Sequence, residues 1–213
     1  MKTDDLINML AGGADVRPAP LPVLKCVLMV AGGVLLAALM MQVVLGVRSD
    51  LSVAATHSAL WTKLLYVSAL AGVGAFALAR LARPGARISA LPLLLAAPVV
   101  LMALSATLSL LAAPPVSRAG LFWGSTWNVC PWLIAALSVP VLGAIIGVLR
   151  MLAPTRLRLT GAVAGLTAGA LAAVVYCLHC PEVATPFVAF WYTLGMLIPA
   201  AVGALIAPRV LAW

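Results

Sequence analysis

The chain has few charged residues, and very few of them are acidic. Only 8% of its 213 residues are Asp, Glu, Lys or Arg, and five of these are acidic. Soluble domains carry about 25% charged residues, so this chain has too few polar side chains to cover a water-facing surface. Hydrophobic residues make up 65% of the sequence, and its mean hydropathy is +1.19. The composition indicates an integral membrane protein.

The apolar runs of the sequence also lack charge at their centres, where no Asp, Glu, Lys or Arg occurs. Intramembrane charges usually mark ion paths and proton relays. Their absence argues against an ion-coupled transporter or a proton pump.

Six apolar runs are long enough to cross a bilayer, which takes about 20 residues per helix. The runs are continuously apolar rather than alternating, and this favours helices over a β-barrel. They cover residues 21–47, 60–81, 88–113, 131–152, 159–178 and 186–207. We predict an all-α, polytopic membrane protein with an N-terminal tail (1–20) and one six-helix transmembrane domain (21–213). The first run is too long for the core of a signal peptide and is expected to be retained.

The basic residues predict the orientation of the six helices. The formal net charge is +8, and most Lys and Arg residues lie in the tail, in the second and fourth loops and after the last run. The first, third and fifth loops hold only Arg48 and Arg118. By the positive-inside rule, both termini are cytoplasmic. We therefore expect the basic residues to contact the lipid bilayer, and we expect no direct binding to nucleic acid.

The fifth run carries a regular stripe of glycines at Gly161, Gly165 and Gly169. Small residues at this spacing let two helix backbones approach closely in lipid. The stripe predicts packing between helices of one chain. The alternative is a seam between two copies, which would make the protein a homo-oligomer.

Two of the four cysteines are followed by proline, as Cys130-Pro131 and Cys180-Pro181. Proline is favoured at the first position of a helix, so each cysteine is predicted to be the N-cap of the next helix. A thiol there feels the positive end of the helix dipole, which lowers its pKa and makes it a better nucleophile and metal ligand. The predicted topology places both thiols on the outer side.

Residues near Cys180 leave several chemistries open. Cys177-Leu-His179-Cys180 is a single C-x-x-C motif, which occurs in redox pairs, in half metal sites and by coincidence. Cys130, Cys177, His179 and Cys180 together offer a ligand set for Cu(I) or Zn. A structural disulfide between Cys130 and Cys180 is the other alternative. Glu182, the acidic residue of the fifth loop, is a candidate for tuning a neighbouring thiol.

The N-terminal tail begins with a pattern typical of a short helix. Thr3 can cap it, and Asp4 and Asp5 complement its dipole. An apolar stripe follows, formed by Leu6, Ile7, Met9 and Leu10. A helix this short is marginal in water, and its acidic face is unlike that of a membrane anchor. The pattern therefore favours docking into a groove of a partner protein.

Four stretches of the chain resemble a known family. They cover residues 2–11, 128–132 around Cys130, 179–182 around Cys180, and the aromatic stretch 186–195. With these stretches the whole chain resembles the NrsF-type negative regulators of sigma F, a bacterial family of six-span membrane proteins.

The resemblance implies a regulator rather than an enzyme, with no cofactor. It implies an anti-sigma factor in the bacterial inner membrane that sequesters an extracytoplasmic-function sigma factor. The two periplasmic cysteines of the family fall on Cys130 and Cys180, which are implied to sense heavy metals or oxidants and are the metal ligands expected here. We assign sigma-factor binding to the tail. Its residues are Thr3, Asp4, Asp5, Leu6, Ile7 and Leu10.

Two alternatives are kept. A membrane thiol–disulfide oxidoreductase would use Cys177 and Cys180 with a quinone. A metal transporter would need thiols or methionines along its bore, and Met40 and Met41 are its only candidate cluster.

Overall fold

The computed structural model describes residues 3–12, 23–82, 90–152 and 154–212, and within them every regular element is helical. Six of the helices are long and apolar enough to cross a membrane, with mean hydropathy values of 1.7 to 2.4. They are α2 (Val23–Val44), α4 (Ser58–Leu81), α5 (Leu91–Ala112), α7 (Cys130–Arg150), α8 (Leu157–Tyr176) and the last span (Thr185–Val210). The prediction of six such helices is confirmed, with ends that differ by a few residues.

The last span is built from three pieces. It begins with α9 (Thr185–Phe187), continues as the π-helical turn η1 (Val188–Tyr192) and ends with α10 (Thr193–Val210). Two short helices complete the bundle, α3 (Leu51–Ala54) and α6 (Pro115–Trp123). Single π-helical turns inside α-helices are frequent at functional sites.

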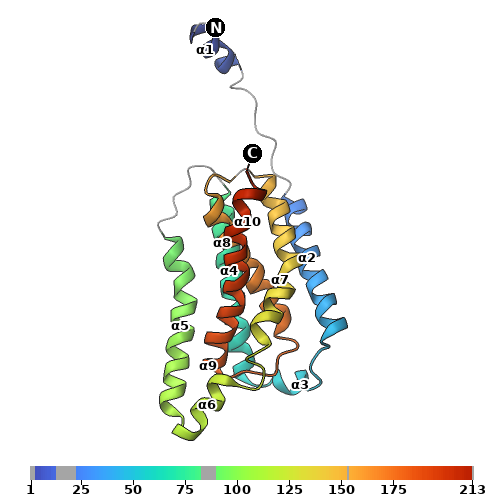
Figure 1. Ribbon diagram of the computed structural model, residues 1–213, viewed down its shortest axis with the longest axis vertical. Helices are drawn as coiled ribbons and strands as arrows, with labels where there is room; N and C mark the ends of the chain where they lie inside the picture. The colour runs from blue at the N-terminus through green and yellow to red at the C-terminus, as the bar shows by residue number, and fades with distance from the viewer. Residues whose placement is uncertain (1–2, 13–22, 83–89, 153, 213) are drawn as a thin grey trace.

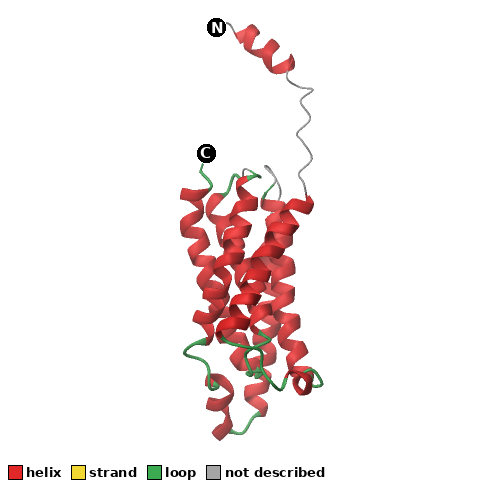
Figure 2. Ribbon diagram, turned by 90° about the vertical axis from the view of Figure 1, so that its right-hand side faces the viewer, coloured by secondary structure: helices red, strands yellow, loops and turns green. Residues whose placement is uncertain are grey.

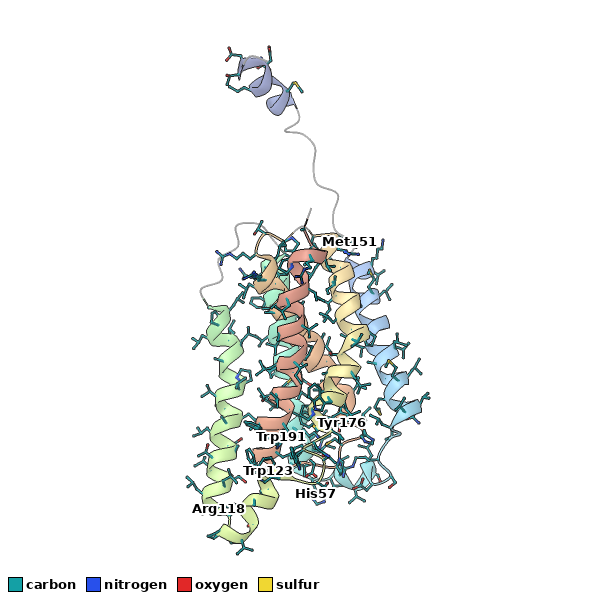
Figure 3. The ribbon with its side chains drawn as sticks, viewed as in Figure 1. His57, Arg118, Trp123, Met151, Tyr176 and Trp191 are labelled. Atoms are coloured by element: carbon teal, nitrogen blue, oxygen red, sulfur yellow. The ribbon has the colours of Figure 1, made fainter. Side chains whose placement is uncertain are left out.

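The long helices run along one bundle in alternating directions (Figures 1 and 2). We call one end the thiol end, because it holds Cys130 and Cys180 together with α3, α6 and α9. We call the other the basic end, because Arg80, Arg150 and Arg209 lie in the last turns of α4, α7 and α10. Figure 3 shows Tyr176 and Trp191 near the thiol end and Met151 at the basic end.

Local signals explain where several helices begin and end. Proline occupies the first turn of α5, α6, α7 and α9, where its missing N–H leaves no hydrogen bond unmade. Gly46 follows α2 with a φ of 75°, and its N–H donates to the carbonyl of Met41 (3.0 Å). A glycine in this left-handed conformation is a common end to a helix.

Helix α8 is the centre of the bundle and lies against α10, α7, α4 and α2. Its glycines face α10: Gly161 meets Gly203, and Gly165 meets the backbone of Pro199 and Ala200. Gly169 meets Met196 in the same way. The prediction of packing within one chain is confirmed for this stripe, so a contact between two copies would need another face.

The N-terminal helix α1 (Thr3–Gly12) lies apart from the bundle (Figure 1). It exposes Thr3, Asp4, Asp5 and Ile7. The side chains of Leu6 and Leu10 and residues 13–20 of the predicted tail lie outside the described residues.

The contact between α8 and α10 gives a first prediction. A Cβ added at Gly165 would lie 2.7 Å from the Cα of Ala200 and would overlap the Pro199 carbonyl, whereas a Cβ at Gly143 meets nothing within 4 Å. Overpacking of this kind costs about 1–3 kcal/mol. We expect Gly165→Ala to lower the thermal midpoint of the detergent-solubilised protein, and Gly143→Ala to leave it unchanged. Equal midpoints for the two variants would contradict this packing.

Candidate functional site

Cys130 is the first residue of α7 rather than its N-cap, which is Val129. The N–H of Cys130 donates to the carbonyl of Thr126 (2.9 Å), so the turn before the helix already includes it. Pro131 still lies in the first turn, as predicted. The predicted N-cap position is therefore wrong by one residue, and Cys130 remains at the amino end of a helix.

The prediction that Cys180 is an N-cap is wrong. The N–H groups of His179 and Cys180 both donate to the carbonyl of Tyr176 (3.0 Å each), so Cys180 completes the last turn after α8. Residues 181–184 are not helical, and the next helix begins at Thr185 with Pro186 in its first turn. The helix start predicted at Cys180-Pro181 lies instead at Thr185-Pro186, because Cys180 is hydrogen-bonded to Tyr176 in the turn that ends α8.

Cys130 and Cys180 nevertheless meet. Both residues are completely buried (0% exposed), and their side chains interact within the same core cluster. Both cysteines are free, as is the buried Cys177. The structure thus brings together two thiols from different elements, the start of α7 and the turn after α8, in a reduced pair that could close into a disulfide or hold a soft metal ion.

The surroundings distinguish Cys180 from Cys177. The hydrogen bond with Cys130 lowers the pKa of the Cys180 thiol below its usual range, burial opposes this shift, and the positive charge of Lys63 and the backbone N–H of Glu182 lower it further. Burial instead raises the pKa of the Cys177 thiol to about 11. Near neutral pH the thiolate, which is the reactive form, is therefore favoured at Cys180 and suppressed at Cys177. Of these two thiols, Cys180 is therefore the one whose surroundings favour the thiolate.

His179 and Glu182 have partners away from the two thiols. His179 Nδ1 donates to the carbonyl of Gly46 (2.9 Å), which ties the turn to the end of α2. The Glu182 carboxylate accepts hydrogen bonds from the N–H and the hydroxyl of Ser125 (2.7 Å each). In the described ranges, no three His, Cys, Asp or Glu side chains are grouped closely enough to hold a metal ion. The structure does not assemble the four-ligand set, so a metal ion here would depend on the two thiols.

The methionines considered for a transporter do not share an environment. Met41 is buried in the core at 2% exposure, whereas Met40 is 40% exposed on the outside of α2.

Sequence reasoning missed Lys63, which lies in the second turn of α4 and is 1% exposed. Its ammonium group donates to the carbonyls of Cys180 (3.2 Å) and Glu182 (2.8 Å) and lies 4.5 Å from the centre of the Tyr192 ring. A signal was present in the sequence: Lys63 shares the helical spacing of Leu60, Val67 and Leu70, which form the buried face of α4.

The fold and the site define a class of protein: a helical protein with six helices long and apolar enough to cross a membrane and a buried thiol pair at one end. The chain belongs to the NrsF family, described as negative regulator of sigma F, whose family model matches residues 10–213. This confirms the resemblance noted above. Members of this family are regulatory proteins rather than enzymes, as expected.

Two relatives match the chain over its whole length and theirs. One, from Azospira oryzae, is named probable anti-sigma-F factor NrsF and is 50% identical over 213 residues. The other, from Caulobacter vibrioides, is named anti-sigma-F factor NrsF and is 34% identical over 214 residues. No solved structure matches the chain.

The contrast between the two thiols gives a second prediction. Alkylation by iodoacetamide consumes the thiolate, so its rate rises with pH through the pKa of each thiol. We expect Cys180 to reach half its maximal rate below pH 8.5, the usual pKa of a thiol, and Cys177 to do so only near pH 11. Mass spectrometry of the full-length protein in detergent can follow both sites in one sample. Equal midpoints, or a lower midpoint for Cys177, would contradict the assignment.

Proposed function

We propose that this chain is an anti-sigma factor of the bacterial inner membrane. It binds an extracytoplasmic-function sigma factor at its cytoplasmic side and releases it when Cys130 and Cys180 react with a heavy metal or an oxidant. The observation that carries the proposal is the contact between these two thiols at one end of a six-helix bundle. The names of the two relatives, both anti-sigma-F factors, support the sigma factor as partner.

The distribution of charge supports the orientation. The described arginines at the basic end outnumber those at the thiol end, where Arg48 and Arg118 lie. Those at the basic end are Arg80, Arg150, Arg156, Arg158 and Arg209. By the positive-inside rule the basic end is cytoplasmic, and the thiol end faces the periplasm. Metals and oxidants from outside the cell therefore reach the thiol end first.

Helix α1 is the proposed docking element for the sigma factor. It presents the acidic side chains of Asp4 and Asp5, and its apolar Ile7 is 56% exposed. A helix of ten residues is marginal in water by itself. An apolar groove on the sigma factor would stabilise α1 by burying its apolar stripe.

The thiol pair can respond by two chemical routes. With hydrogen peroxide, the Cys180 thiolate attacks one oxygen, the O–O bond breaks, and the released hydroxide takes a proton to form water, leaving a sulfenic acid. The Cys130 thiol then displaces the sulfenic oxygen as a second water, and a disulfide remains. With a soft metal ion, the two sulfurs bind as thiolates and their protons are released.

Either route changes the distance between the start of α7 and the turn that joins α8 to the last span. Cys130 begins α7, and Cys180 lies in the turn between α8 and the last span. A disulfide would draw the two sulfurs to about 2.05 Å. Because α7, α8 and α10 pack against one another, the shift is carried toward the basic end. A change of about 3 kcal/mol there would lower sigma-factor affinity more than a hundredfold, a typical magnitude for allosteric coupling.

Serine substitutions test the sensing role. We expect Cys130→Ser and Cys180→Ser to bind sigma F of the same organism normally and to retain it when cadmium or peroxide is added, because a single thiol cannot form the pair. Cys177→Ser, the matched control, should release it as the wild type does. Co-purification from detergent measures all three variants. Normal release by Cys130→Ser would refute thiol sensing.

Substitutions in α1 test the docking surface. Ile7→Glu places a charge in the apolar stripe and should weaken sigma-factor binding at least tenfold, as should deletion of residues 2–11. Asn8→Ala, on the opposite face of the helix, should bind like the wild type. Binding to the immobilised full-length protein gives the affinities. Unchanged binding after the deletion would place the docking surface elsewhere on the chain.

A further inference from the structure

Lys63 is a buried cation without an acidic partner in the described ranges, where Arg48 with Asp50 is the one ion pair. It lies on the inner face of α4, with Leu60 and Val67 one turn to either side. Removing an ammonium group from water is costly, and charged residues inside membrane helices are therefore rare and usually functional. The buried position of Lys63 therefore indicates a functional role for its charge.

The contacts of Lys63 converge on the thiol turn, by which we mean residues 177–184 between α8 and α9. Its Nζ donates to the carbonyls of Cys180 and Glu182, the residues on either side of Pro181, at 3.2 Å and 2.8 Å. The same group lies over the ring of Tyr192 in η1. One side chain from α4 therefore holds both ends of the Cys-Pro-Glu segment and contacts the π-helical turn that follows.

His179 and the Glu182 side chain also tie this turn to Gly46 and Ser125, but the carbonyls on either side of Pro181 depend on Lys63. Residues 181–184 form no helix, and Pro181 has no N–H to donate. The Cys180 N–H is anchored to Tyr176, but its carbonyl and that of Glu182 are bound by Lys63. Lys63 fixes the carbonyl of Cys180, and the sulfur belongs to the same residue. Lys63 therefore restricts where that sulfur can lie relative to Cys130 at the start of α7.

We propose that Lys63 is the positioning residue of the thiol pair: by binding the carbonyls of Cys180 and Glu182, it holds Cys180 against Cys130 and sets how readily the two form a disulfide. This inference rests on the proposed function, since it assigns a role within the same thiol site. Lys63 touches neither an oxidant nor a metal in this role and acts through the turn.

Equilibrium with glutathione measures this effect directly. One cysteine of the pair attacks glutathione disulfide and displaces one glutathione, and the second cysteine then displaces the other. The protein loses two thiol protons and two electrons, and glutathione disulfide becomes two glutathione thiols. The equilibrium constant is the effective concentration of one thiol at the other, which falls when the turn is free to move.

The experiment uses the full-length protein in detergent with Cys26→Ala and Cys177→Ala, so that only the pair can react. We expect Lys63→Met to lower the effective concentration at least tenfold. Lys63→Arg, which keeps the charge and the donors, should restore it to within about threefold of the parent. Tyr66→Phe is the matched control, because it removes a different, partly buried hydrogen bond of α4, to Thr193 (2.6 Å), and should leave the value unchanged.

Each remaining outcome is decisive. An unchanged value in Lys63→Met, or an equal loss in Tyr66→Phe, would overturn the inference, because general loosening of α4 would then explain the effect. If Lys63→Met does not fold, Lys63→Gln replaces it under the same threshold. Sigma-factor release is not part of the measurement. The serine variants described above measure release separately. If the glutathione equilibrium depends on Lys63 but the serine variants release the sigma factor normally, the proposed function is refuted and the role of Lys63 stands.

Discussion

The close approach of α8 and α10 is the contact on which the thiol site depends. Three glycines on α8 and one on α10 leave no side chains between the two backbones. These two consecutive segments are joined by a short connection, residues 177–184. This connection lies at the thiol end of the bundle, where α7 begins. Because α7 also packs against α8 and α10, this arrangement brings the connection with Cys180 to Cys130 at the start of α7.

Burial gives this thiol pair a particular chemical character. Neither sulfur is exposed, so a reagent must be small or the turn over the pair must open. The surrounding apolar core includes Tyr176, Phe187 and Tyr192. Such surroundings disfavour thiolates, as at Cys177, unless hydrogen bonds and a nearby cation compensate. Cys180 has both kinds of compensation, and Lys63 contributes to its position as well as to its charge environment.

The sequence predicted the helices well because their signals are local. An apolar run of about 20 residues has to satisfy its own backbone hydrogen bonds in lipid, so it forms a helix wherever it lies in the fold. The glycine stripe predicted close helix packing equally well, because a helix face without side chains lets another backbone approach. The two Cys-Pro pairs show the limit of such reasoning. The same dipeptide begins a helix at Cys130 but follows one at Cys180, because Thr185-Pro186 competes as a start and the last turn of α8 extends to Cys180.

By itself, the amino-acid sequence determined the helical class, the six apolar segments and the asymmetry of basic residues, all of which follow from composition and short-range spacing. Only the tertiary structure decided that Cys130 and Cys180 meet, while His179 bonds to Gly46 and the Glu182 carboxylate bonds to Ser125. It also revealed Lys63 as the residue that holds the turn, across 117 residues of sequence. These contacts join distant segments, and which partners meet depends on how the helices pack rather than on any pattern within one of them.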